Sequence, residues 1–156
     1  MKYRLLTKEQ FEVLHKEFAH FLASQQIDAK EWAALKKNQP NVATQELQVF
    51  SDVVWDEVLT KARYLEHFSK KTINLFYCDL QVMKRIVIQV EKEIDLTQNH
   101  EYQWLVSNPT HEAVQYLSGT KNYLKERNLE IFELIEKGSQ LSNGKLFLHF
   151  SKLIDQ

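Results

Sequence analysis

Hydrophobic residues recur at helical spacing along the first part of the chain. Thr7 and Gln10 form the pattern of a capping box, in which each side chain satisfies a free backbone N–H at a helix start. The apolar residues that follow recur three, four or seven positions apart, which places them on one stripe of a helix. This spacing predicts an amphipathic first helix from about Thr7 to Ser24.

Two more helices are expected before residue 70. Asp28 and Glu31 repeat the capping pattern and predict a short second helix, which Pro40 ends because proline disfavours helix in the residue before it. A third helix is expected from about Thr44 to Phe68. Its apolar positions cover a wide arc, which is typical of a central helix that is contacted from more than one side.

The periodicity changes after Phe68. The segment Thr72–Asp79 is rich in β-forming residues and too short for a good helix. The segment Met83–Ile94 fits a strand or a helical face, and its β-branched run from Ile86 to Ile88 favours the strand. We therefore expect a β-hairpin, with a helix over residues 83–94 as the open alternative. A hairpin alone is marginally stable, so it must lie on helices or extend into a larger sheet.

The last third of the chain again predicts helices. Their expected ranges are Gln98–Ser107, His111–Ser118, Lys121–Lys137, with Gly138 as its stop, and Asn143–Ile154. Together the segments predict a single domain over residues 1–156. Its expected fold class is mainly α (α+β): a multi-helix domain around a long central helix with a small β-hairpin.

Composition limits the function classes. The chain has 156 residues, with 20 Lys+Arg against 21 Asp+Glu, and this near-neutral balance argues against a dedicated nucleic-acid binder. No apolar run is longer than four residues, the length of residues 75–78, and this is far shorter than a membrane span. The N-terminus lacks the apolar segment of a secretory signal, and Cys78 has no second cysteine to pair with. We expect a cytoplasmic protein that binds neither nucleic acid nor membrane.

Motifs for cofactors and metals are incomplete. The segment Gly138–Lys145 has five residues between its glycines, where a phosphate-binding P-loop requires four. His111-Glu112 begins like a zinc-protease motif, but Gln115 stands in place of the second histidine. Two Glu-x-x-His units both fall on the first predicted helix, whereas di-iron bundles need them on different helices. We therefore expect no metal and no cofactor.

The best polar cluster falls on the third predicted helix. Asp52, Asp56, Arg63 and His67 lie within an arc of about 60° if every residue there is helical. Two carboxylates one turn apart can bind a cation or perturb each other's pKa, and an arginine can orient an anionic ligand. These four residues are the candidate ligand-binding set. An ordinary solvated helix face is the competing interpretation, and no catalytic set is identified.

Acidic residues also recur along the predicted helix over Lys121–Lys137. Glu126, Glu130 and Glu133 fall opposite its apolar stripe, so we expect them to face solvent.

Two blocks carry a resemblance to known sequences. Residues 64–79, YLEHFSKKTINLFYCD, and residues 125–138, KERNLEIFELIEKG, resemble a family of small uncharacterised bacterial proteins. The resemblance implies a cytoplasmic bacterial single-domain protein of unknown function, and it transfers no site residue.

Two functional hypotheses follow. The first is a non-catalytic protein–protein interaction or structural module, with self-association through the free edges of the hairpin. The alternative is a small-ligand binder or an enzyme that uses the polar face of the third helix.

Overall fold

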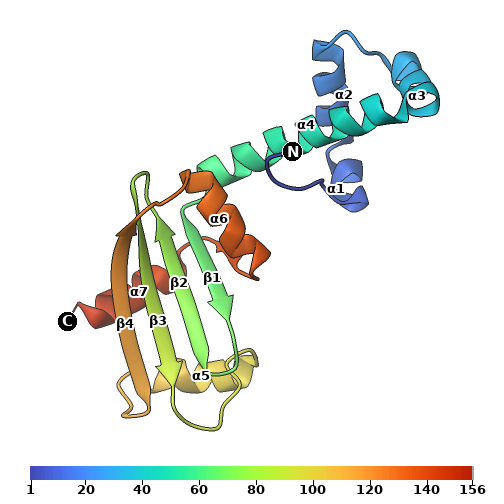
Figure 1. The fold of residues 1–156 in the computed structure, drawn as a ribbon. Helices are drawn as coiled ribbons and strands as arrows, with labels where there is room; N and C mark the ends of the chain where they lie inside the picture. Colours follow the sequence, from blue (N-terminus) through green and yellow to red (C-terminus); the bar gives the residue numbers. More distant parts are fainter. Residues whose placement is uncertain (156) are drawn as a thin grey trace. The chain divides into compact units, whose positions relative to one another are not determined.

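The structure is a computed structural model that describes residues 1–155. The chain divides into two compact units, Met1–Thr60 and a second unit that begins at Lys61. Figure 1 shows both units, and each is described by itself below. The expectation of a single domain over residues 1–156 stays a prediction.

The first unit is helical. Its helices are α1 (Lys8–Val13), α2 (His15–Ser24), α3 (Ala29–Asn38) and α4 (Pro40–Lys61). Both predicted caps are confirmed: the Thr7 hydroxyl accepts the Gln10 N–H at 3.1 Å, and the Asp28 carboxylate accepts the Glu31 N–H at 2.8 Å.

The predicted first helix is two helices that meet at Leu14. Leu14 leaves helical geometry, with φ −98° and ψ 21°. The change of direction lets rings from both helices reach one aromatic residue of α4. Phe11 of α1 and Phe18 of α2 have ring centroids 6.1 and 5.0 Å from that of Phe50. This aromatic cluster is the core of the first unit.

The predicted third helix has the wrong limits. α4 begins at Pro40, because a proline at the first helical position lacks only an N–H that would be unpaired there. It ends at Lys61, and Tyr64–Phe68 forms a strand, β1. Leu65 fits the apolar face of the predicted third helix, and it also fits the alternation of a half-buried strand. The sequence pattern at this position is therefore compatible with either element.

The second unit contains a five-stranded antiparallel sheet, so the predicted fold class, a mainly helical domain with a small β-hairpin, is wrong. The strands are β1 (Tyr64–Phe68), β2 (Thr72–Cys78), β3 (Val82–Val90), β4 (Val114–Asn122) and β5 (Gln140–Ser142). Their order is β4-β3-β2-β1-β5. The chain is an α+β fold, and its hairpin extends on both sides into a larger sheet.

The predicted hairpin itself is confirmed. β2 and β3 pair in antiparallel register, with Ile73 opposite Ile88 and Leu75 opposite Ile86. The strand interpretation of residues 83–94 is thereby confirmed over 83–90, and the strand ends at Val90.

The later helices are partly as expected. α5 (Asn99–Ser107) and α7 (Lys145–Ile154) match their predicted ranges closely. The predicted helix over 111–118 is wrong, because that segment enters β4. α6 (Arg127–Glu136) consequently starts later than predicted, and Gly138 follows it with φ +108°, as expected for a residue that ends a helix.

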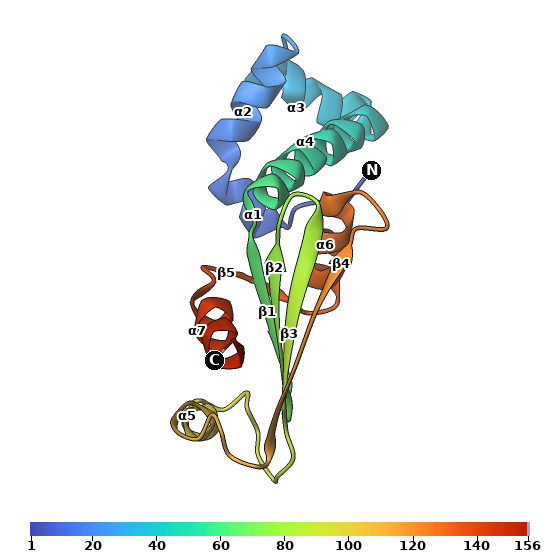
Figure 2. The same cartoon turned by 90° about the vertical axis from the view of Figure 1, so that its left-hand side faces the viewer.

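One face of the sheet carries the core of the second unit. Strand residues alternate between faces, so Ile73, Leu75, Ile86 and Ile88 share one side. They cluster with buried residues such as Phe150 of α7, and Figure 2 shows α5 and α7 on this side.

The opposite face is only partly covered. In Figure 2, α6 lies on the side of the sheet away from α7. Phe76, Cys78 and Met83 are buried on this face, and Ile131 of α6 is fully buried. Farther along the same face, Leu117 of β4 remains 58% exposed. The second unit thus presents an apolar sheet surface beside α6.

A glycine is required where β5 leads into α7. Gly144 has φ +85°, and a Cβ there would lie 2.5 Å from Cδ2 of Tyr64. We expect Gly144→Ala to destabilise the protein by about 2–4 kcal/mol, from the left-handed backbone and the steric overlap. Urea unfolding checks this. Gly119→Ala is the control, because no atom lies within 4 Å of its Cβ position. If the Gly144→Ala and Gly119→Ala proteins were equally stable, glycine would not be required at position 144.

Candidate functional site

The four predicted ligand-binding residues do not lie on one helix. Asp52 and Asp56 lie on α4. Arg63 follows the end of that helix, and His67 belongs to β1 in the second unit. The single helical arc that motivated the set is therefore wrong, because α4 ends at Lys61. Ligand binding by the four residues stays a prediction.

Asp52 and Asp56 bind the N-terminal segment of the chain. Asp52 accepts the backbone N–H groups of Lys2 at 2.6 Å and Tyr3 at 2.9 Å. Asp56 accepts the Tyr3 hydroxyl and lies 3.7 Å from the Lys2 ammonium. Burial, with the Asp56 carboxylate beside it, raises the pKa of Tyr3 to about 12. These contacts give both aspartates a structural role.

A substitution tests that role. Asp52→Ala removes the acceptor for two backbone N–H groups, and we expect a loss of about 1–3 kcal/mol in the free energy of unfolding. Glu12→Ala, at an exposed helix position, should change it by less than about 0.5 kcal/mol. Urea unfolding of both variants is the measurement. An Asp52→Ala protein as stable as the Glu12→Ala protein would show that the contacts contribute nothing.

The main candidate site is a groove in the second unit, with a cavity volume of about 710 Å³. Its floor consists of side chains on the open face of β2, β3 and β4, including Phe76, Met83, Val87 and Leu117. Its wall is the side of α6 that carries Glu130 and Leu134, with Lys137 just beyond. We call this site the α6 groove.

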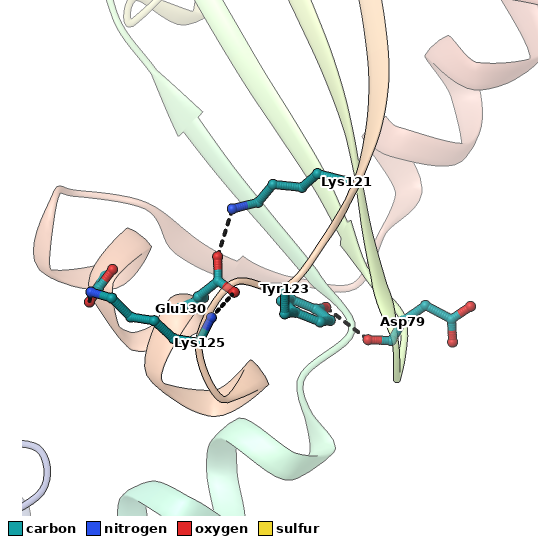
Figure 3. Close-up of polar contacts among 6 residues, drawn as sticks. Asp79, Lys121, Tyr123, Lys125 and Glu130 are labelled. Atoms are coloured by element: carbon teal, nitrogen blue, oxygen red, sulfur yellow. Dashed lines mark hydrogen bonds and ion pairs between the residues drawn. The ribbon is translucent and has the colours of Figure 1, made fainter.

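An ion pair between Glu130 and Lys121 joins the wall of the groove to β4. The Glu130 side chain is 8% exposed and accepts the Lys121 ammonium at 2.6 Å and the Lys125 backbone N–H at 3.1 Å (Figure 3). Burial alone would raise the pKa of Glu130, but these donors outweigh it and hold the pKa below its ordinary value. The prediction that Glu130 faces solvent is therefore wrong.

Glu133 differs from its neighbour on the same helix. It binds the Lys125 ammonium at 2.5 Å, and its side chain is 45% exposed. The acidic pattern on α6 thus contains one buried structural carboxylate and one partly exposed carboxylate.

The start of α6 is fastened to the ends of two strands. The Arg127 guanidinium donates to the backbone carbonyls of Ala62, Cys78 and Asp79. The Tyr123 hydroxyl donates to the same Asp79 carbonyl at 2.8 Å (Figure 3). A planar guanidinium can serve several acceptors at once, so these bonds hold α6 in position on the sheet.

Two cations of the groove remain for a ligand. Arg85 donates from Nε and Nη2 to the Asn74 side-chain oxygen at 3.0 and 2.6 Å, and it lies 5.7 Å from the Phe76 ring centroid. Lys137 follows the C-terminal end of α6. Within the described part of the chain, neither Arg85 nor Lys137 forms an ion pair with a carboxylate. The groove therefore combines an apolar floor with Arg85 and Lys137, while its two carboxylates, Glu130 and Glu133, pair with Lys121 and Lys125.

Other chemistry-bearing groups lie outside this arrangement. Burial raises the pKa of the Cys78 thiol to about 11, so it is protonated at neutral pH. Over residues 1–155, no three His, Cys, Asp or Glu side chains are grouped so that they could hold a metal ion. No helix in that range is both long and apolar enough to cross a membrane.

Sequence reasoning did not find the α6 groove. Arg85 and Lys84 lie on opposite faces of β3, and the alternation of residues 84–88 was the available signal for two faces. The sequence did not indicate the ion pair between Lys121 and Glu130, because Lys121 was predicted to lie in a helix and lies in β4.

The buried carboxylate predicts a pH-dependent contribution to stability. Because folding lowers the pKa of Glu130 below 4.5, its contribution is present above that pH and is lost as the pH falls through the folded-state pKa. We expect Glu130→Gln to cost about 1–2 kcal/mol at pH 7 and progressively less below about pH 4. Urea unfolding across this pH range measures the difference from wild type.

Glu133→Gln is the matched control. Its exposed ion pair should contribute less than about 0.5 kcal/mol at any pH. A Glu130→Gln penalty that does not change with pH would contradict the assigned charge state.

Fold and site together define the class: an α+β protein in which a helix and the open face of an antiparallel sheet form a groove. The chain belongs to DUF6495, a family of unknown function whose family model matches residues 1–155. This confirms the resemblance to a family of uncharacterised proteins. Comparison with curated proteins and with solved structures gave no match.

Proposed function

We propose that this protein is a binding module whose α6 groove takes a ligand with an apolar body and an anionic group. The observation that carries the proposal is the position of Arg85, which is held by Asn74 at an apolar floor and has no carboxylate partner within residues 1–155.

The size and lining of the groove support an apolar ligand body. A volume of about 710 Å³ lies within the usual range for small-molecule sites, about 300–1,000 Å³. Phe76, Met83, Val87, Leu117 and Leu134 supply the apolar surface. Such sites are typically apolar, with a few polar groups that orient the ligand.

The arrangement of Arg85 supports an anionic group. The bonds to Asn74 involve Nε and Nη2, so N–H groups of Nη1 remain for a carboxylate, sulfonate or phosphate. A guanidinium held in place loses little side-chain entropy when it binds an anion. Lys137 adds a second positive charge at the same groove.

The proposal combines elements of both sequence-based hypotheses. The alternative of a small-ligand binder is retained, but it moves from the third helix to the sheet of the second unit. Protein interaction was expected because the hairpin was predicted to have free edges. Those edges are not free, because β1 and β4 flank β2 and β3. We also propose a cytoplasmic location, which the free thiol of Cys78 supports, and a bacterial origin, which rests on the sequence resemblance alone.

Two dyes of similar shape test the proposal. 8-Anilinonaphthalene-1-sulfonate is an apolar body with one anionic group, and N-phenyl-1-naphthylamine is its neutral counterpart. We expect saturable fluorescence binding of the sulfonate, and Arg85→Met should weaken it about fivefold, as loss of roughly 1 kcal/mol implies. Affinity for the neutral dye should stay the same in both proteins.

Lys84→Met is the matched control, because Lys84 lies on the other face of β3. It removes the same charge without reaching the groove, so both dyes should bind as in wild type. Equal loss of sulfonate binding in the Lys84 and Arg85 variants would show only a general charge effect. That result, or sulfonate binding that does not saturate, would overturn the proposal.

A further inference from the structure

The two edges of the sheet differ in how they are protected. β5 forms one edge and has three residues, a length too short to template much pairing. β4 forms the other edge over nine residues, in unbroken register with β3. It contains no proline, and Lys121 is its single charged residue. A long edge with so little protection is a template on which another strand can pair.

The direction of the backbone groups of β4 follows from the ladder. The Glu91 N–H donates to the Ala113 carbonyl at 2.8 Å, one step beyond the pair Val90 and Val114. In an antiparallel ladder, hydrogen-bonded pairs alternate with non-bonded ones. The odd-numbered residues of β4 therefore bond to β3. The N–H and C=O groups of Tyr116, Ser118 and Thr120 point away from the sheet.

These outward groups are arranged symmetrically. Ser118 is the midpoint of the strand Val114–Asn122. If a second copy adds its own β4 in antiparallel orientation with a two-fold axis at Ser118, each outward-facing residue meets another outward-facing residue. Ser118 then faces Ser118 of the partner subunit, and Tyr116 faces Thr120 of the partner subunit. An aromatic residue opposite a β-branched one is a favourable cross-strand pair.

The side chains in this register are also complementary. Leu117, which is 58% exposed, faces Gly119 of the partner subunit. No atom lies within 4 Å of the Cβ position of Gly119, so space for the leucine is open. Lys121 faces Gln115 of the partner subunit, and no charged residue faces a like charge. Both fits are repeated by symmetry, which favours a second copy over an unrelated strand.

We propose that this protein forms a homodimer through β4, with the two-fold axis at Ser118 and a continuous ten-stranded sheet. The two α6 grooves lie on the same face of that sheet, and Leu117 of the partner subunit extends the floor of each. The dimer goes beyond ligand binding and is measured without any ligand, so either proposal can fail alone.

Reciprocal charge substitutions at Ser118 test the dimer. Only a residue on the axis faces itself, so Ser118→Lys alone and Ser118→Glu alone each place like charges opposite one another. We expect wild type to sediment as a dimer, and each variant to dissociate with a constant at least about fivefold higher. An equimolar mixture of the two variants should recover wild-type affinity or better, because lysine then faces glutamate.

Two further variants complete the experiment. Leu80→Lys makes the same charge change at the exposed turn between β2 and β3 and should leave the dimer intact. Gln115→Glu should tighten the dimer about twofold to fivefold, since it places a carboxylate opposite Lys121 of the partner subunit. Circular dichroism establishes that each variant is folded.

A wild-type protein that is monomeric at about 100 µM overturns the proposal. So does a Ser118→Lys protein that dimerises as well as wild type. If both charge variants are monomers and their mixture stays monomeric, a two-fold axis at Ser118 is wrong. If Ser118 variants do not fold, a Gln115→Glu dimer no tighter than wild type overturns the register.

Discussion

The ion pair between Glu130 and Lys121 is the interaction on which the second unit's open face depends. It joins the helix α6 to the strand β4 at a place where burial alone would favour a neutral side chain. The Arg127 bonds to strand-end carbonyls fasten the beginning of the same helix. With α6 fixed in this way, it covers part of the sheet face and forms a wall beside the remainder. The groove exists because α6 is held on this face of the sheet but covers only part of it.

Strand alternation explains why one sheet has two such different faces. Ile86 and Ile88 point to the side of α5 and α7, where a full apolar core forms. Arg85 and Val87 point to the other side, where the short helix α6 leaves room. A single strand therefore contributes to both the core and the candidate site. The energetic cost of exposing Leu117 on the second face is consistent with a surface that is covered when a ligand or a second copy binds.

Local signals in the sequence were sufficient for some elements and not for others. The caps at Thr7 and Asp28, the hairpin of β2 and β3, and helix α7 all depend on residues close in the sequence, and these were predicted correctly. β1 and β4 were assigned to helices because their apolar residues also fit helical spacing. Their strand form is decided by partners far away in the chain. The candidate site was missed for the same reason, since Arg85, Lys121 and Glu130 converge only once β4 and α6 are in place.

Chemical-shift mapping tests the central claim most directly, because it locates binding without a substitution. In a titration of the ¹⁵N-labelled protein with 8-anilinonaphthalene-1-sulfonate, the account predicts saturable amide shifts confined to one face. They should cluster at Phe76, Arg85, Val87, Leu117 and Lys137, with α5 and α7 unaffected. Shifts that cluster on α7 or within residues 1–60, or that spread over the chain without saturating, would contradict it.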